Sequence, residues 1–325
     1  MDNITRWKAL GPLNVNLTGG GFSLDNIKIF RFDDEEFRII FNKIDKGYWS
    51  PIFLSSAGKS LCWITLDFEV NTGENPWEKA VNHLYLFLQS LGLFKSTLSL
   101  LMVGGLLVRQ LDEVNSFPSE FFGLESSIYL GPRYVLWNEE YNDFLEFLNK
   151  YKYFRSNYEE NKSSEKQLKR IYGAIHFYTR SFQSKSLVPR FINLCISLEC
   201  LFGEGQHELK YRYSNRVAML LGDNIERRKS VYNNIRKLYD KRSKILHGRT
   251  KWSISPKEVL TLNEIIRQSI LRCISLYIKK YKKITQSLDD CLHDPNKHKE
   301  LLKDSRFYFG KQSDFKIPKE LRTIF

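Results

Sequence analysis

Arg242 and His247 are two residues whose types and spacing could do chemistry together. At about 3.6 residues per helical turn, Arg242 falls near the centre of an apolar stripe. Burying an unpaired guanidinium costs several kcal/mol, so this arginine needs an acid, an anion or an open cleft. Gly248 is typical of a helix end, which places the titratable His247 in the last turn. The apolar stripe consists of Val231, Ile235, Leu238, Tyr239, Ile245 and Leu246.

The spacing of Arg242, four residues and His247 resembles the signature of the HEPN superfamily of helical ribonucleases. Flanking segments in the same order are similar to successive blocks of the Apea-like HEPN family. These blocks are Ile192–Phe202, Glu208–Arg216, Leu220–Gly222 and Leu238–Gly248. The resemblance covers roughly residues 160–285 and does not extend to the first half of the chain.

The resemblance implies a metal-independent endoribonuclease, without a cofactor, of a bacterial defence system (anti-phage or abortive infection) or a toxin system. In such a reaction the 2′-hydroxyl of RNA attacks the adjacent phosphate and leaves a 2′,3′-cyclic phosphate and a 5′-hydroxyl. His247 fits the acid–base role and Arg242 fits the stabilisation of the phosphorane charge. Many family members carry Asn, Asp or His directly after the arginine, and Ser243 departs from this pattern.

Three further residues, Ser243, Glu199 and Asp240, are candidates to support the site. Either acid could orient Arg242, or could pair with it in a purely structural salt bridge. Basic side chains nearby are candidates to hold RNA phosphates, although a solvated helical face explains them equally well. These candidates are Arg212, Arg216, Lys241, Lys244 and Arg249.

Positive charge is concentrated in the second half of the chain. The net charge is +13, and residues 161–290 contain 27 Lys and Arg against 11 Asp and Glu, or +16, which leaves −3 elsewhere. A basic region attracts polyanions, so RNA, tRNA included, is the expected partner. Two alternatives are a catalytically inactive HEPN-type regulator that binds RNA or a nucleotide, and a regulator that binds only proteins.

Composition indicates a cytoplasmic protein with no membrane partner. The five cysteines form no Cys-x-x-Cys pair, which is typical of a reducing compartment. The oiliest run, Ser96–Val108, has 13 uncharged residues where a membrane helix needs about 20. Ala57–Ser60 lacks the first glycine of a phosphate-binding loop, and Cys291, His293 and His298 lack a fourth metal ligand at a familiar spacing.

The patterning predicts an α+β chain, with an N-terminal domain of mixed strands and helices followed by an all-α HEPN-type helical bundle. Residues 1–155 form the first domain, which we expect to restrain the bundle or to sense a phage or cellular trigger. Residues 160–285 form the bundle, which we expect to fold without the first domain, and residues 286–325 form a tail packed on a domain. Predicted features of the first domain are strands at Phe37–Phe41, Leu61–Val70 and Ser127–Trp137, helices after Pro76 and at Asn138–Tyr153, and a linker at Arg155–Ser164.

Five helices are predicted after the linker. They begin at Glu165, after Pro189, at Leu209, at Ile225 and at Pro256, where Ser255 and Glu258 make a capping box. Residues five apart on a helix are offset by about 140°, so Arg242 and His247 of one chain do not converge readily on one phosphate. A two-fold homodimer would bring both helix ends into one cleft.

Overall fold

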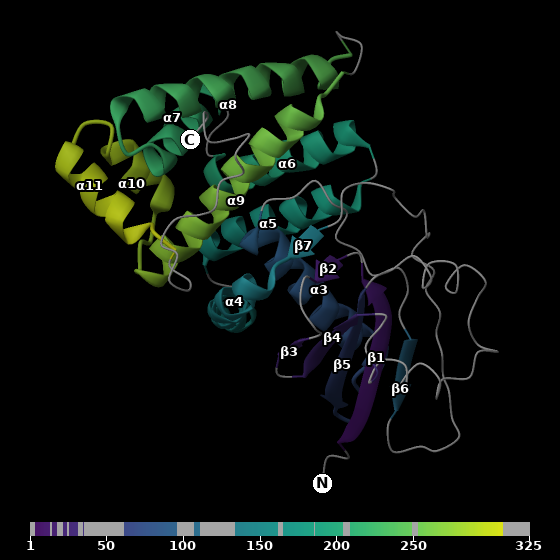
Figure 1. Ribbon diagram of the computed structural model, residues 1–325. Coiled ribbons are helices and arrows are strands. Elements are labelled where there is room, and N and C mark those ends of the chain that lie inside the picture. Colours follow the sequence, from purple (N-terminus) through teal and green to yellow (C-terminus); the bar gives the residue numbers. More distant parts are fainter. Residues whose placement is uncertain are drawn as a thin grey trace. The chain divides into compact units, whose positions relative to one another are not determined.

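The computed structural model combines a sheet with a larger helical part (Figure 1). It describes residues 4–13, 15–17, 22–24, 26–31, 35, 62–95, 107–110, 134–161, 165–184, 186–203, 209–248 and 253–307. Contacts divide the chain into two units. The strand unit is Met1–Leu88 with Ser99–Leu145, and the helical unit is Gln89–Leu98 with Glu146–Phe325. The predicted α+β class is confirmed at this level.

The strand unit contains a five-stranded antiparallel sheet with the order β3-β4-β5-β1-β6. Its strands are β1 (Thr5–Leu13), β3 (Phe22–Leu24), β4 (Ile27–Arg31), β5 (Cys62–Val70) and β6 (Leu107–Gln110). A separate parallel pair joins β2 (Val15–Leu17) to β7 (Tyr134–Leu136). Of the predicted strand Ser127–Trp137, residues 127–133 lie outside the described residues, as do Phe37–Phe41 and Ala57–Ser60.

β5 is the central strand, paired with β4 on one edge and β1 on the other. In the sequence of this strand, Trp63, Thr65, Asp67 and Glu69 alternate with apolar residues, a period typical of a half-buried strand. Trp63 and Thr65 are buried, with 0% and 2% of their surface exposed. Asp67 is partly exposed and Glu69 is exposed. The strand itself is confirmed, but half-burial is wrong for its first part, because both faces of a central strand can be covered.

The helices that follow are α3 (Pro76–Phe94), α4 (Tyr141–Asn161), α5 (Lys166–Gln183), α6 (Leu187–Phe202), α7 (Leu209–Leu221), α8 (Ile225–Leu246), α9 (Pro256–Ile278), α10 (Ile284–Asp290) and α11 (Pro295–Asp304). Those from α3 to α9 agree closely with the apolar periodicity, whereas α10 and α11 were not predicted. A short 3-10 helix, η2 (Asn138–Glu140), precedes α4. Pro189 lies inside the first turn of α6 and not before it, because a first-turn residue needs no N–H partner.

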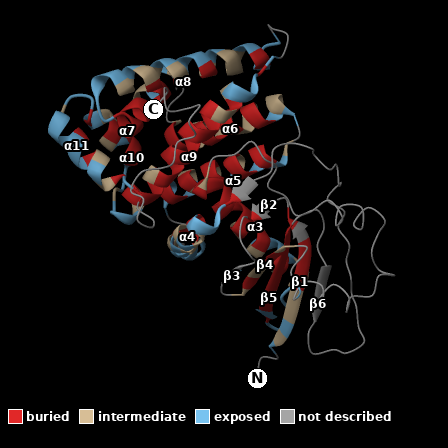
Figure 2. Cartoon of the chain, in the orientation of Figure 1, coloured by how far each residue is buried: buried red, intermediate tan, exposed pale blue. Residues whose placement is uncertain are grey.

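α9 forms the core of the helical unit, and Figure 2 shows it coloured almost entirely as buried. Its start confirms the predicted capping box. The Ser255 hydroxyl accepts from the Glu258 N–H at 3.3 Å, and the Glu258 carboxylate accepts from the Ser255 N–H at 2.9 Å. A helix buried on all sides also buries polar side chains, and these need partners.

Buried polar side chains of α9 bind the last residues of α3. The Arg267 guanidinium pairs with Glu264 at 2.7 Å and donates to the carbonyls of Leu93 and Phe94 at 3.0 and 3.1 Å. The end of α3 therefore belongs to the helical unit, although most of α3 belongs to the strand unit.

A second contact fixes the same helix end. The Tyr178 hydroxyl donates to the carbonyl of Gly92 or to Asn263, at 2.9 and 2.7 Å respectively. A fragment that begins at residue 160 would lack the end of α3 and all but the last two residues of α4. The helical unit is thus larger than the predicted bundle at 160–285, and we no longer expect that bundle to fold alone.

The predicted linker needs correction, and the tail contains two helices that were not predicted. α4 continues to Asn161 and its Phe154 is buried, so most of the segment expected as a linker is helical. The tail forms α10 and α11, whose Leu288 and Leu301 are buried. Phe307 lies 5.8 Å from Phe147, between ring centroids, so the tail packs within the helical unit. Apolar positions in a polar segment were too few to reveal these helices from periodicity.

Candidate active site at the end of α8

α8 ends where the sequence predicted. Leu246 is its last residue, and His247 is its C-cap, with a backbone N–H that donates to the Ser243 carbonyl at 3.1 Å. Gly248 has a φ of +65°, the left-handed conformation expected of it. The His247 side chain is exposed, so a substrate in solution can reach it.

Most of the predicted apolar stripe of α8 is buried. Val231, Ile235, Leu238 and Ile245 contact the interior, with at most 7% of each exposed. Leu246 is the exception, with 53% exposed, because it lies about 100° around the helix from Ile245. The end of α8 therefore presents an apolar side chain beside the imidazole.

Arg242 forms an ion pair with an acid, Glu199. Its Nη2 lies 2.8 Å from the Glu199 Oε1 on α6, and the two side chains are 22% and 27% exposed. The guanidinium carbon lies 5.8 Å from the centroid of the Tyr239 ring, within reach of a cation–π contact. Its Nε is buried without a hydrogen-bond partner. About a quarter of each side chain in this ion pair is thus exposed, and one guanidinium donor is unsatisfied.

The surroundings of this pair disfavour negative charge. Burial raises the pKa of the Glu199 carboxyl, and the Arg242 guanidinium only partly offsets this effect. Burial, aided by Glu199, also raises the pKa of Tyr213 well above its usual range, so that its hydroxyl stays protonated. Glu199 is therefore an acid whose hold on Arg242 weakens readily on protonation.

Tyr213 is a residue of this site that sequence reasoning missed. Its ring lies 5.8 Å from that of Tyr239, between centroids, and both border a small cavity with Cys195 and Glu199. Tyr239 could have been found, since it precedes Arg242 by three residues and shares its helix face. Nothing local in the sequence connects Tyr213 to this site, because its contact with Tyr239 depends on how α7 packs against α8.

The other predicted supporting residues have different surroundings. Asp240 pairs with Lys210 at 2.5 Å and not with Arg242. Ser243 is half buried, and its carbonyl accepts the His247 N–H. No hydrogen bond or ion pair joins the Arg242 and His247 side chains in the part of the chain that the structure describes. One chain therefore does not by itself bring the two residues into contact.

Candidate RNA-binding residues fall into three groups. Arg216 is buried; its guanidinium binds Asp289 at 2.6 and 2.8 Å and the Phe202 carbonyl at 2.6 Å, which favours a structural role over the predicted phosphate contact. Lys241 pairs with Glu258 at 2.6 Å. Arg212 and Lys244 are exposed, and Arg249 lies outside the described residues.

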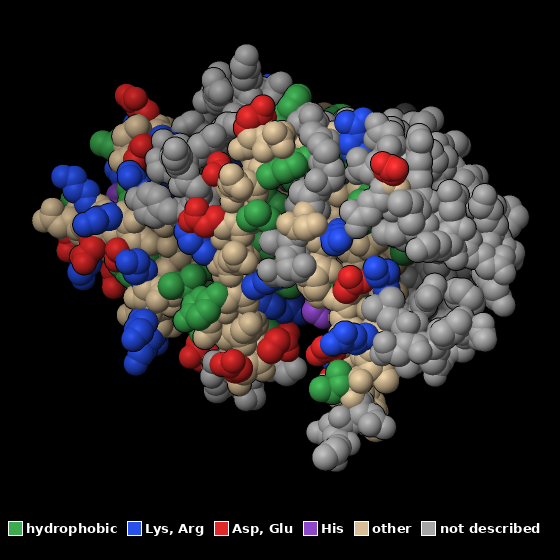
Figure 3. All heavy atoms as spheres, turned by 60° about the horizontal axis from the view of Figure 1, so that its bottom comes forward, with side chains coloured by type: hydrophobic (Ala, Val, Ile, Leu, Met, Phe, Trp, Pro, Cys, Tyr) green, Lys and Arg blue, Asp and Glu red, His purple; other side chains and the backbone are tan. Residues whose placement is uncertain are grey.

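The positive charge of the helical unit does not form one continuous patch on the face drawn in Figure 3, where Lys and Arg are interspersed with Asp and Glu. Cys291, His293 and His298 do not come together as ligands: His298 is buried and bonds the Met219 carbonyl at 2.8 Å. No group of three or more His, Cys, Asp or Glu in the described ranges is placed to hold a metal ion.

None of the described helices has the length and apolar character needed to cross a bilayer. The arrangement at the end of α8 offers a partly exposed arginine, an acid with a raised pKa and an exposed histidine. These groups could bind a phosphate and transfer a proton. Comparisons of the chain with protein-family models, curated proteins and solved structures found no match, so the site's own geometry carries the functional argument.

Proposed function

We propose that this protein is a metal-independent endoribonuclease of the HEPN type, acting in a bacterial defence or toxin system. The observation that carries the proposal is the ion pair of Arg242 with Glu199, partly exposed and next to the helix end that bears His247. A guanidinium kept near the surface by an acid can exchange that acid for a phosphate oxygen. The basic composition of residues 161–290 supports a polyanionic substrate.

The proposed reaction needs no group beyond these side chains and RNA. His247 removes the proton of a 2′-hydroxyl, whose oxygen attacks the adjacent phosphorus. The phosphorus–5′-oxygen bond breaks, and the leaving oxygen takes up a proton from an imidazolium, giving a 2′,3′-cyclic phosphate and a 5′-hydroxyl. Arg242 donates to the phosphorane oxygens while their charge is highest, and Glu199 positions it.

A homodimer built at the end of α8 would complete the site. The Arg242 side chain points towards Glu199 on α6, whereas His247 is exposed at the end of α8. In one chain the two side chains therefore point in different directions. Leu246, which is 53% exposed, supplies apolar surface next to His247 for a two-fold contact. Across such an axis, Arg242 of one chain could act with His247 of the other.

A second candidate is an inactive regulator that binds RNA. The observation in its favour is that Arg242 already has an internal partner, as a purely structural arginine would. The two candidates differ in a measurable way. An enzyme must lose cleavage when Arg242 is removed, whereas a regulator has no cleavage to lose.

The test is incubation of the purified full-length protein with total RNA in EDTA, with analysis of the new ends. We expect 2′,3′-cyclic phosphate products from the wild type and at least a hundredfold less from His247→Ala. His293→Ala is the matched control, because His293 is also an exposed histidine just after a helix, and it should cut normally. Equal cleavage by wild type and His247→Ala would exclude the proposed site, and no cleavage by any sample would favour the regulator.

The shared site is tested by mixing Arg242→Ala chains with His247→Ala chains. Each variant alone should be inactive. If one Arg and one His suffice, mixed dimers recover about half the activity of the wild type, since one of the two composite pairs is intact. A protein that is monomeric at the assay concentration and cuts at full rate would exclude the dimer but not the roles of the two residues.

A further inference from the structure

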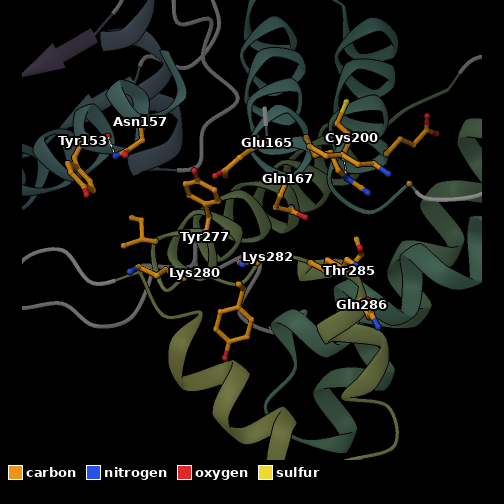
Figure 4. A pocket seen from close by; sticks show the side chains of 17 residues that line it. Tyr153, Asn157, Glu165, Gln167, Cys200, Tyr277, Lys280, Lys282, Thr285 and Gln286 are labelled. Atoms are coloured by element: carbon orange, nitrogen blue, oxygen red, sulfur yellow. Dashed lines mark hydrogen bonds between the residues drawn. The ribbon is translucent and has the colours of Figure 1, made fainter. Parts of the chain in front are cut away.

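A pocket of about 1200 Å³ lies within the helical unit and shares Glu199, the partner of Arg242, with the candidate active site. Its walls come from α4, the start of α5, the end of α6 and the segment that joins α9 to α10. Figure 4 shows side chains of α5, Glu165 and Gln167 among them, facing Tyr277 and Lys282. We call it the lysine pocket, after Lys166, Lys280, Lys282 and Lys283.

Cations outnumber anions around the lysine pocket. Three of its lysines, Lys280, Lys282 and Lys283, are exposed and form no ion pair within the described residues. The two acids of the lining are both occupied. Glu199 pairs with Arg242, and Glu165 accepts a hydrogen bond from Tyr277. Burial, together with this hydrogen bond, raises the pKa of the Tyr277 hydroxyl to about 12. The lining therefore has cationic charge left for an anion from outside.

One of these lysines is held in a strained backbone conformation. Lys280 has a φ of +66°, and no other non-glycine residue in the described ranges has a positive φ. Its N–H bonds the Tyr277 carbonyl at 2.8 Å, and the Tyr281 N–H bonds the Leu276 carbonyl at 3.0 Å, a helix ending that ordinarily uses glycine at this position. A lysine in the place of glycine costs stability, and such strain is concentrated at functional positions.

A buried donor at the pocket also lacks a partner. Gln167 is only 9% exposed, and its side-chain nitrogen makes no hydrogen bond. It lies in the first turn of α5, whose N-cap residue Glu165 makes no capping hydrogen bond with its side chain. The side chain at the N-cap of α5 thus leaves the start of this helix uncapped by Glu165, and helix N-termini favour anions.

We propose that the lysine pocket binds a small ligand with two or more phosphate groups. Lys280, Lys282 and Lys283 would neutralise the phosphates, and the start of α5 would donate hydrogen bonds to them. Tyr277 and the exposed Tyr153 add ring surface on which a nucleobase could stack. The pocket shares Glu199 with the candidate active site, but the proposed phosphate contacts of Lys280, Lys282 and Lys283 are not part of that site, so the inference does not depend on RNA cleavage.

Titration calorimetry on the full-length protein tests this, with inorganic tripolyphosphate and ATP as probes. We expect saturable binding of both, and tighter binding of ATP if the tyrosines contact its base. Lys282→Ala combined with Lys283→Ala should weaken binding at least tenfold, because two phosphate partners are lost. Lys297→Ala combined with Lys299→Ala removes two exposed lysines of α11 outside the pocket and should change binding less than twofold.

Lys280→Gly separates function from folding. Glycine adopts a positive φ without strain, so this variant should melt at a higher temperature than the wild type while it binds tripolyphosphate more weakly. The proposal would be overturned if neither probe bound saturably, or if the α11 control lost as much affinity as the Lys282/Lys283 variant. It would also be overturned if both Lys280→Gly and the Lys282/Lys283 variant bound the probes as tightly as the wild type. Pocket-dependent binding of a short single-stranded RNA, with neither small probe bound, would also overturn it.

Discussion

Two arginine–glutamate pairs of the helical unit have nearly the same bond length and very different surroundings. Arg267 and Glu264 lie 2.7 Å apart with 2% and 0% of their side chains exposed, whereas Arg242 and Glu199 lie 2.8 Å apart with 22% and 27% exposed. The Arg267 guanidinium also bonds two backbone carbonyls, so it holds α3 against α9. The Arg242 guanidinium keeps one buried donor unsatisfied.

The difference teaches that the distance within an ion pair says little about its role. A buried pair with every donor engaged is costly to break, because each partner left alone is an uncompensated charge. A partly exposed pair is weak, because water screens both partners. We therefore assign Arg267 to stability and Arg242 to binding an anion, and each assignment can be tested.

The largest expected effect is on stability, from Arg267→Ala. Removal of this guanidinium leaves Glu264 charged and buried, and should lower the free energy of unfolding by about 3–5 kcal/mol. Urea unfolding followed by circular dichroism measures it. The double variant Arg267→Met with Glu264→Leu serves as control and should recover part of the loss, because it leaves no buried charge. A loss below about 1 kcal/mol for Arg267→Ala would remove the contrast between the two pairs.

Arg242→Ala should give the opposite result. We expect a stability change of less than about 1 kcal/mol, with cleavage of RNA reduced by about a hundredfold to a thousandfold. The matched control is Arg236→Ala, an exposed arginine of the same helix that lies 5.5 Å from the Tyr232 ring, and it should retain activity. Severe unfolding of Arg242→Ala would instead place this arginine with Arg267, as a structural residue.

Glu199→Gln should show a small, pH-dependent effect. Burial raises the folded-state pKa of Glu199 above its usual value of 4.5, so the folded protein holds this proton more tightly than the unfolded chain does. Tighter proton binding by folded Glu199 adds to the free energy of unfolding below the unfolded-state pKa. This stabilisation is lost as the pH rises through the folded-state pKa.

The wild type should therefore lose stability relative to Glu199→Gln as the pH rises above the usual carboxyl pKa of 4.5, by less than about 1 kcal/mol. Unfolding of both proteins over this range measures the difference. A slope of the opposite sign would mean that the attraction of Arg242 outweighs burial and that the pair is stronger than its exposure suggests.

The smallest effect concerns two neighbouring lysines of α8. Lys244 is exposed without an ion pair in the described part of the chain, whereas Lys241 is paired with Glu258. If a lysine with an internal ion pair cannot contact RNA, the slope of log affinity against log salt concentration should fall by about one phosphate contact in Lys244→Ala. It should fall by less in Lys241→Ala. Affinity at several salt concentrations distinguishes them, and equal slopes would argue against this rule.

Local patterns predicted the helices well because apolar periodicity and capping are encoded within a few residues. The capping box at Ser255 and the glycine ending at Gly248 were both placed correctly. Of the candidate site, the sequence offered Glu199 as a partner of Arg242, but gave no reason to prefer it to Asp240. Only the packing of α6 against α8 decides between them, and the same is true of Tyr213.

Burial of polar residues was the least predictable feature. Arg216 and Arg267 look like surface cations in the sequence, yet both are buried on carbonyls from distant helices. Lys280 likewise gave no signal, because a lysine in a positive-φ helix ending contradicts the residue preference on which such predictions depend. The lysine pocket was missed for a different reason, because four separate segments of the chain contribute to it.

The hold of α9 on the end of α3 also sets an order of events during synthesis. Arg267 and Phe94 are separated by 173 residues. A ribosome therefore synthesises Arg267 roughly 10–30 seconds after the α3 carbonyls to which it donates. Closing so long a loop is entropically costly and slows folding. Arg242 and His247 are therefore made before the helical unit can close, and a nascent chain that stops short of Arg267 should remain unfolded and without activity.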